Sequence, residues 1–128
     1  DRDFHVTSRT ACILMSHNYE YDRDVLKKLL KSSAPYIGIL GPRKRFDKML
    51  AEFRSEGIEP GIIDLDRIHS PIGLDIAAET PDEIAVSIIS EIQAKFHGRS
   101  GGFLKNRAAP IHERDSSGFI VLKQPYLT

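Results

Sequence analysis

Tyr36-Ile37-Gly38-Ile39-Leu40-Gly41-Pro42-Arg43-Lys44-Arg45 is the stretch of this 128-residue sequence that decides the fold. Its first five residues form a short and continuous apolar run, which is typical of a parallel strand covered on both faces. Gly41 allows the backbone to turn tightly at the carboxyl end of that strand. Pro42 suits the first position of a helix, so we predict a strand, a glycine turn and a helix in succession.

Three cations, Arg43, Lys44 and Arg45, occupy the first turn of this predicted helix. The free N–H groups and the dipole of a helix make its N-terminus favourable for an anion and unfavourable for cations. We therefore interpret the turn as a site for a ligand phosphate, which Arg grips with two parallel hydrogen bonds and Lys attracts as a point charge. The alternative is a basic turn that is simply solvated.

The composition is that of one ordinary globular domain, with 41% hydrophobic and 28% charged residues. Eighteen basic and eighteen acidic side chains cancel, so nothing in the net charge suggests nucleic acid or a membrane surface as a partner. The single cysteine excludes an internal disulfide and fits a reducing compartment. No apolar run approaches the roughly 20 residues that span a bilayer, and no signal peptide follows Asp1, so we expect a cytoplasmic protein.

A second apolar run, Ala11-Cys12-Ile13-Leu14-Met15, predicts another buried parallel strand, which ends at Ser16-His17-Asn18. Cys12 is interpreted as a small buried hydrophobe. We place Asp22 as the N-cap of the next helix, in preference to a catalytic acid. The buried face of that helix should carry Val25, Leu26, Leu29 and Leu30.

The later part of the chain contains two further helix patterns. The helix after Pro42 should bury Phe46, Met49, Leu50 and Phe53 and end at Gly57 as a left-handed cap. Residues 58–68 are left open between helix, turn and strand. Thr80-Pro81-Asp82-Glu83 predicts a capping box with Pro81 as the first helical residue. The helix that it starts should run to about Phe96 and bury Ile84, Ala85, Ile88, Ile89 and Ile92.

Strand, helix, strand, helix, loop and helix is the pattern of a parallel sheet with crossover helices, so we predict an α/β fold. Ligands of such sheets bind outside the carboxyl ends of the strands, and residues 16–18 and 41–43 should therefore face one crevice. No G-x-G-x-x-G fingerprint follows a strand anywhere in the sequence.

Three more side chains are weighed as ligand contacts. His17 lies where a strand gives way to a loop, and it either contacts a ligand or caps backbone groups. Asn18 bonds either a ligand amide or its own turn, and we favour the turn. Asp75 needs a partner if it is buried; it either pairs with the cations at 43–45 or accepts from ligand N–H groups, and we favour a structural partner. The histidines His5, His69, His97 and His112 are scattered, so no metal site is expected.

Three segments, taken together and in order, resemble one family. They are Ser16-His17-Asn18-Tyr19-Glu20-Tyr21-Asp22, then residues 36–45, then Pro71-Ile72-Gly73-Leu74-Asp75-Ile76 followed by Thr80-Pro81-Asp82-Glu83-Ile84-Ala85. This order and spacing resemble the carboxyl-terminal Rossmann-like domain of the xanthine dehydrogenase accessory proteins, the XdhC/CoxI family, from about Ala11 to Phe96. The resemblance implies a Rossmann-like parallel sheet with flanking helices over residues 11–97, between an N-terminal segment at 1–10 and a tail at 98–128. Within that tail, the apolar run Gly118-Phe119-Ile120-Val121-Leu122 is by its own pattern a candidate edge strand.

The resemblance also implies that this chain is the later part of a longer protein. The glycine-rich turn after the first Rossmann strand should precede Asp1, so we expect the sheet to lack its first strand or strands here. The family's amino-terminal domain, with its cysteine motif, has no counterpart in the sequence, and Cys12 inherits no role from it.

The function implied by the resemblance is that of a maturation factor, in preference to an enzyme. Such a factor binds molybdenum cofactor (molybdopterin), assists its sulfuration, and helps to insert it into the apo form of a molybdenum hydroxylase such as xanthine dehydrogenase; self-association as a homodimer is also implied. The expected cofactor-binding residues are Gly41, Arg43, Lys44, Arg45, His17, Asn18 and Asp75. The alternative is an NAD(P)-binding oxidoreductase domain, which would need a glycine-rich turn and an acid at the end of the second strand, and the sequence shows neither.

Overall fold

The computed structural model describes residues 5–112. Its elements follow in the order β1 (Ala11–Leu14), α1 (Tyr19–Leu29), β2 (Tyr36–Ile39), α2 (Arg43–Ser55), α3 (Ile62–Arg67), β3 (Ile68–His69), α4 (Pro81–Phe96) and the short 3-10 helix η1 (Leu104–Asn106). The strands form one sheet in the order β1-β2-β3, and both pairings are parallel. The predicted α/β fold with a parallel sheet is confirmed. The candidate edge strand at 118–122 lies outside the described residues.

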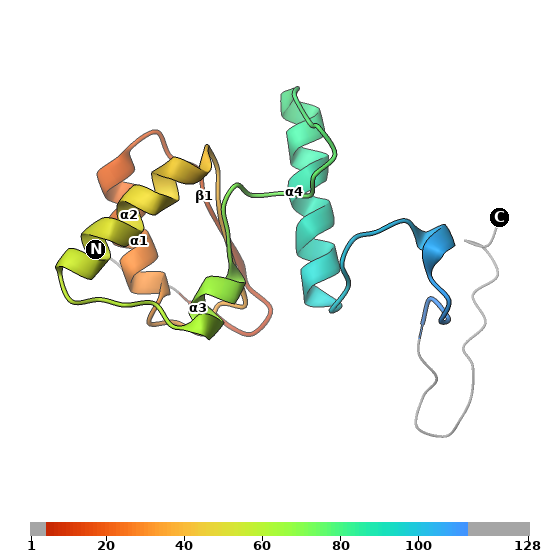
Figure 1. Cartoon of the computed structure of the whole chain (residues 1–128), viewed down its shortest axis with the longest axis horizontal. Helices are drawn as coiled ribbons and strands as arrows, with labels where there is room; N and C mark the ends of the chain where they lie inside the picture. The colour runs from red at the N-terminus through yellow and green to blue at the C-terminus, as the bar shows by residue number, and fades with distance from the viewer. Residues whose placement is uncertain (1–4, 113–128) are drawn as a thin grey trace, which may run out of the picture.

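The hydrophobic core lies between one face of this sheet and the helices α1 and α2, which Figure 1 shows together on one side of the strands. Ile37 and Ile39 of β2 point into it, because alternate residues of a strand face the same side. The predicted faces of both helices are confirmed, and the buried residues that they contribute are Leu26, Leu29, Phe46, Met49 and Phe53. Cys12 is half-buried and packs against this core.

Helix α4 lies on the other side of the sheet (Figure 1), where Tyr36 of β2 reaches its Glu91 and Gly38 of β2 faces Ile72 of the loop after β3. Ile88 is buried as predicted, but the prediction that Ala85 and Ile89 are buried is wrong, and Ile89 is 63% exposed. The reason is geometric: α4 meets the rest of the chain along a single line of residues, and positions 85 and 89 are turned away from that line.

The helix starts agree with the sequence at α4 and differ by a few residues at α1 and α2. Thr80 and Glu83 form the predicted capping box, with Pro81 as the first helical residue. The prediction that Asp22 caps α1 is wrong, because α1 begins at Tyr19 and Asn18 is its N-cap. Pro42 is the N-cap of α2, whereas the sequence predicted the first helical position for it.

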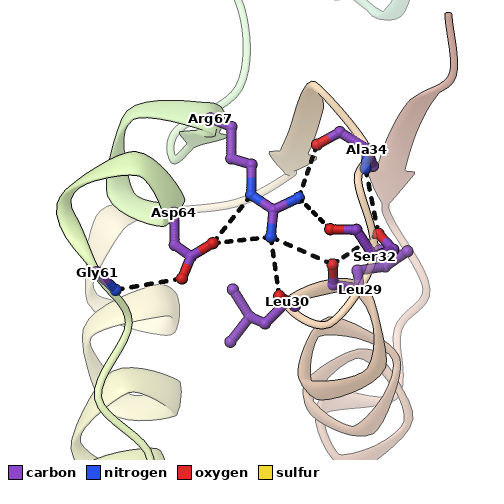
Figure 2. A network of polar contacts seen from close by, with 7 residues as sticks. All are labelled: Leu29, Leu30, Ser32, Ala34, Gly61, Asp64 and Arg67. Atoms are coloured by element: carbon purple, nitrogen blue, oxygen red, sulfur yellow. Dashed lines mark hydrogen bonds and ion pairs between the residues drawn. The ribbon is translucent and has the colours of Figure 1, made fainter. Parts of the chain in front are cut away.

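The interval that the sequence left open contains α3 and the third strand, and both depend on Arg67. Its buried guanidinium donates to the carbonyls of Ser32 (2.8 Å), Ala34 (2.8 Å), Leu30 (2.9 Å) and Leu29 (3.5 Å), which belong to the last residues of α1 and the connection to β2 (Figure 2). The Asp64 carboxylate accepts from the same guanidinium at 2.8 Å and from the amide of Gly61 at 3.2 Å. One side chain thus satisfies the carbonyl groups that a helix leaves free at its carboxyl end.

We predict that Arg67→Ala lowers the free energy of unfolding by about 3 kcal/mol or more, because several buried carbonyls and the Asp64 carboxylate lose their donor. Arg67→Lys should recover only a minor part, because one ammonium group cannot reproduce the planar fork of five donors. Urea denaturation measures the loss. Arg54→Ala is the matched control: its ion pair with Glu59 is exposed, and its removal should change stability by no more than about 0.5 kcal/mol. Equal losses in the two alanine variants would contradict the role of Arg67.

We also predict a pH-dependent contribution from the capping box. The Glu83 carboxylate accepts from the amides of Glu79 (2.8 Å) and Thr80 (3.1 Å), and these two bonds, the Glu79 bond first, lower the pKa of Glu83. A lowered pKa stabilises the folded state above the ordinary carboxyl value of about 4.3 and loses that effect as the pH falls through the lowered value. Glu83→Gln should therefore be less stable than the wild type near pH 7, and the difference should shrink as the pH falls to about 3. Denaturation of the two proteins at both pH values measures the trend, and a difference that stays constant between them would contradict it.

Candidate functional site

The carboxyl ends of β1, β2 and β3 lie at one edge of the sheet, because all three strands are parallel. We call this the carboxyl edge. Three connections leave it: residues 15–18, residues 40–42 and residues 70–80. The backbone joins them directly, since the amide of Leu40 donates to Leu14 O (3.0 Å) and the amide of Ile72 donates to Ile39 O (3.2 Å). The segments 16–18 and 41–43 are therefore neighbours at this edge.

The amino end of α2 is the most basic part of the carboxyl edge. Gly41 has a φ of +110°, a left-handed conformation that favours glycine and turns the chain from β2 toward the helix. The N-cap Pro42 makes no side-chain cap and the first turn contains no acid, whereas side chains cap α1 and α4. Arg43 and Lys44 are exposed in this turn. Free N–H groups with two exposed cations form a place where an anion is stabilised.

Arg43 and Lys44 differ in their contacts. The Arg43 guanidinium pairs with Asp47 at 3.2 Å, one turn along the helix, and reaches Ser70 O at 3.4 Å. Its side chain nevertheless remains 63% exposed, so a ligand can reach it. No hydrogen bond or ion pair within residues 5–112 engages the Lys44 side chain. We refer to these two residues as the edge cations.

Arg45, the third cation of the sequence motif, has a structural partner. Its guanidinium donates to Asp22 at 3.1 Å, and the Asp22 carboxylate, which also accepts from Ser16 Oγ at 2.8 Å, is 2% exposed. Successive residues of a helix point about 100° apart, which turns Arg45 toward α1 and the edge cations toward the solvent. Arg45 therefore differs from Arg43 and Lys44, because its guanidinium forms an ion pair with Asp22.

The remaining candidates from the sequence lie around the same edge without converging on one point. Asn18 bonds its own turn, as favoured, through an oxygen that accepts from Tyr21 N at 3.0 Å. His17 is exposed beside it. Asp75 is also exposed and, among the described residues, has no hydrogen-bond or ion-pair partner, so the structural partner favoured for it is not found. It lines a cavity of about 420 Å³ between residues 71–78 and the start of α4.

A polar cluster that the sequence did not reveal joins α4 to the sheet. The Glu91 carboxylate accepts from Tyr36 Oη at 2.6 Å and from Gly73 N at 2.8 Å, and its other oxygen lies 3.2 Å from His69 Nδ1. The rings of Tyr36 and His69 stack with their centroids 4.5 Å apart. Burial, followed by the hydrogen bond to Glu91, raises the pKa of Tyr36. One feature of the sequence could have indicated this cluster: Glu91 is a carboxylate seven residues after Ile84, on the predicted apolar face of the helix.

No group of three or more His, Cys, Asp or Glu side chains within residues 5–112 is placed to hold a metal ion. None of the helices there has both the length and the apolar character that crossing a membrane requires.

Comparison with protein families and curated sequences agrees with this fold. Residues 1–92 match the XdhC Rossmann domain family. The chain is 33% identical over 98 residues to the uncharacterized protein YqeB of Escherichia coli K12, a match that covers 77% of this chain and 18% of YqeB. It is 33% identical over 90 residues to a probable xanthine dehydrogenase subunit of Bacillus subtilis 168, with 70% of this chain and 24% of that protein covered.

A solved structure shows the same arrangement. The crystal structure of a xanthine dehydrogenase from Bacillus halodurans superimposes with a TM-score of 0.61 and 30% sequence identity, covering 74% of this chain and 27% of that chain. The chain thus spans less than a third of the length of each of these relatives.

We predict that Arg45→Ala lowers the free energy of unfolding by about 3 kcal/mol, because it leaves the buried Asp22 carboxylate unpaired. Arg43→Ala, two positions away, should change it by no more than about 0.5 kcal/mol. Adding Asp22→Asn to Arg45→Ala should restore part of the loss, because the unpaired charge is then removed. Thermal and urea denaturation of the four proteins measure these differences. A similar, small effect of both single variants would contradict the division between Arg45 and the edge cations.

Proposed function

Since the chain belongs to the XdhC Rossmann domain family, we propose that it is the cofactor-handling part of an accessory factor for a molybdenum hydroxylase of the xanthine dehydrogenase type. In this proposal it binds the phosphate end of molybdenum cofactor at the carboxyl edge. It then presents the cofactor for sulfuration and for insertion into the apo enzyme, which is its partner. The name of the Bacillus subtilis relative and that of the crystal structure, both xanthine dehydrogenase, support this choice of client.

The observation that carries the proposal is the uncapped first turn of α2 with its edge cations. An isolated cation in a first turn is unfavourable, and this turn holds two exposed ones and no acid of its own. Arg43 pairs with Asp47 one turn along the helix, whereas no acid among the described residues pairs with Lys44. A phosphate placed there would accept from the backbone amides and from Arg43, and would be attracted by Lys44. The turn at Gly41 leaves room for this approach: a methyl group added there would meet only Arg45 Cδ, at 3.5 Å. The residues of the edge therefore fit a phosphorylated ligand.

The cofactor and the residues of the chain would have different roles. The bound cofactor would supply the molybdenum and sulfur chemistry of the client enzyme. The chain's own residues bind and orient the cofactor's phosphate, while Asn18 and the Asp22–Arg45 pair hold the surrounding loops. His17 and Asp75, both exposed at the same edge, are proposed as contacts to the rest of the ligand.

A nicotinamide dinucleotide also carries phosphates, so an NAD(P)-binding oxidoreductase domain is the competing proposal. No G-x-G-x-x-G turn is present in the 128 residues, and such a turn is the usual way for a Rossmann domain to approach a pyrophosphate. The two functions are distinguished by which ligand binds.

The test is equilibrium binding of the 128-residue chain to molybdenum cofactor and, separately, to NADH. We expect binding of the pterin with weak or no binding of NADH. The double variant Arg43→Ala/Lys44→Ala should weaken pterin affinity by tenfold or more, because a charge-assisted hydrogen bond contributes about 1.5–3 kcal/mol and each 1.4 kcal/mol is a factor of ten.

The control is Lys31→Ala/Arg54→Ala, which removes two exposed cations at the other end of the domain and should leave affinity unchanged. Circular dichroism should show all three proteins equally folded. Equal affinity of the Arg43→Ala/Lys44→Ala variant and the wild type for molybdenum cofactor would overturn the phosphate site. Tight NADH binding without pterin binding would favour the oxidoreductase instead.

A further inference from the structure

The loop after β3 is fastened on both of its sides. Toward the sheet, Ile72 N donates to Ile39 O at 3.2 Å, and Ser70 O accepts from the Arg43 guanidinium at 3.4 Å. Toward α4, Leu74 N donates to Ser87 O at 3.2 Å, and Ser87 Oγ donates to Leu74 O at 2.7 Å. This loop therefore touches an edge cation at one end and α4 at the other.

Gly73 lies in the middle of this loop and brings it into close contact with α4. Its φ is +109°, and a methyl group added to it would collide with Ser87 Oγ. Its amide donates to the Glu91 carboxylate at 2.8 Å. The position of the loop is thus set by α4, and within α4 chiefly by Glu91 and Ser87.

Glu91 is itself held in place from the sheet. Tyr36 Oη, from the first residue of β2, donates to it at 2.6 Å, and His69 Nδ1, from the last residue of β3, lies 3.2 Å away. Its side chain is 16% exposed, so these partners replace most of its water. A carboxylate that accepts from a β2 side chain and from a loop amide, with the His69 ring beside its other oxygen, has a single arrangement that satisfies both hydrogen bonds.

We propose that Glu91 is a positioning residue for the carboxyl edge. By joining Tyr36, His69 and Gly73, it fixes the loop whose Ser70 carbonyl orients the Arg43 guanidinium toward the ligand phosphate. This role rests on the proposed function, and it is distinct from it because Glu91 itself touches no ligand. It gives α4 a part in ligand affinity, although that helix contributes no group to the phosphate site.

Two substitutions at this position separate the geometry from the charge. Glu91→Gln keeps an oxygen that can accept from Tyr36 and Gly73, so it should retain the loop and nearly all of the affinity. Glu91→Ala removes the hydrogen bonds from Tyr36 and Gly73 and the contact with His69. Gln93→Ala, an exposed residue of the same helix, is the matched control.

The experiment measures the affinity for molybdenum cofactor and the hydrogen exchange of the Gly73 and Leu74 amides. In Glu91→Ala we expect both amides to exchange faster and the affinity to fall about five- to tenfold, with Glu91→Gln and Gln93→Ala close to the wild type. In the Arg43→Ala/Lys44→Ala background, Glu91→Ala should change the affinity by less than about twofold, because the residue through which it acts is gone.

The outcomes distinguish the two proposals. Suppose that the wild type binds molybdenum cofactor and the Arg43→Ala/Lys44→Ala variant does not, but Glu91→Ala binds it normally. The positioning role is then overturned and the proposed function stands. An equal loss from Glu91→Ala in both backgrounds also overturns it, because the effect would then bypass Arg43. If the wild type does not bind the pterin, the proposed function fails and the positioning role fails with it.

Discussion

Two arginines that engage buried acceptors, the buried Arg67 and the partly buried Arg45, lie at opposite ends of the sheet and are the interactions on which this small domain depends. The strands contain four, four and two residues, so the hydrogen bonds between them are few. At the amino end of β2, Arg67 donates hydrogen bonds to carbonyls at the end of α1 and in the following turn. At the carboxyl end, Arg45 holds Asp22 and so joins the starts of α1 and α2. A buried ion pair adds little net stability over an apolar pair, but breaking one is costly, so both arginines fix the arrangement of helices that the short strands leave loosely specified.

The parts of this structure that the sequence predicted are those whose cause is local. The apolar runs at 11–15 and 36–40 located β1 and β2, and the 3.6-residue period located the buried faces of α1 and α2. The capping box at Thr80 was identified correctly because all of its atoms lie within four residues. In each of these cases the partner of a residue is within one or two turns of it in the chain.

The parts that it did not predict have partners far away in sequence. The third strand is two residues long, and it is recognisable only through its pairing with Ile37 and Gly38. Arg67 meets carbonyls more than 30 residues before it, and Glu91 meets Tyr36 55 residues before it. The three cations at 43–45 looked equivalent for the same reason. Which of them faces the buried Asp22 carboxylate depends on where α1 packs, and the sequence of the motif does not determine that.

The attachment of α4 follows a different rule from that of α1 and α2. Those two helices are held by a core of large apolar side chains, whose burial is stabilising without being directional. Helix α4 buries Ile88, while Val86 and Ile89 remain exposed, and it is tied to the rest of the domain through Ser87, Glu91 and the pair of Lys95 with Asp66. Hydrogen bonds weaken steeply when their angles change, so a helix held in this way has one well-defined position or is released. These bonds link the position of the helix to that of the loop beside it, which reaches the carboxyl edge through Ser70 and Ile72.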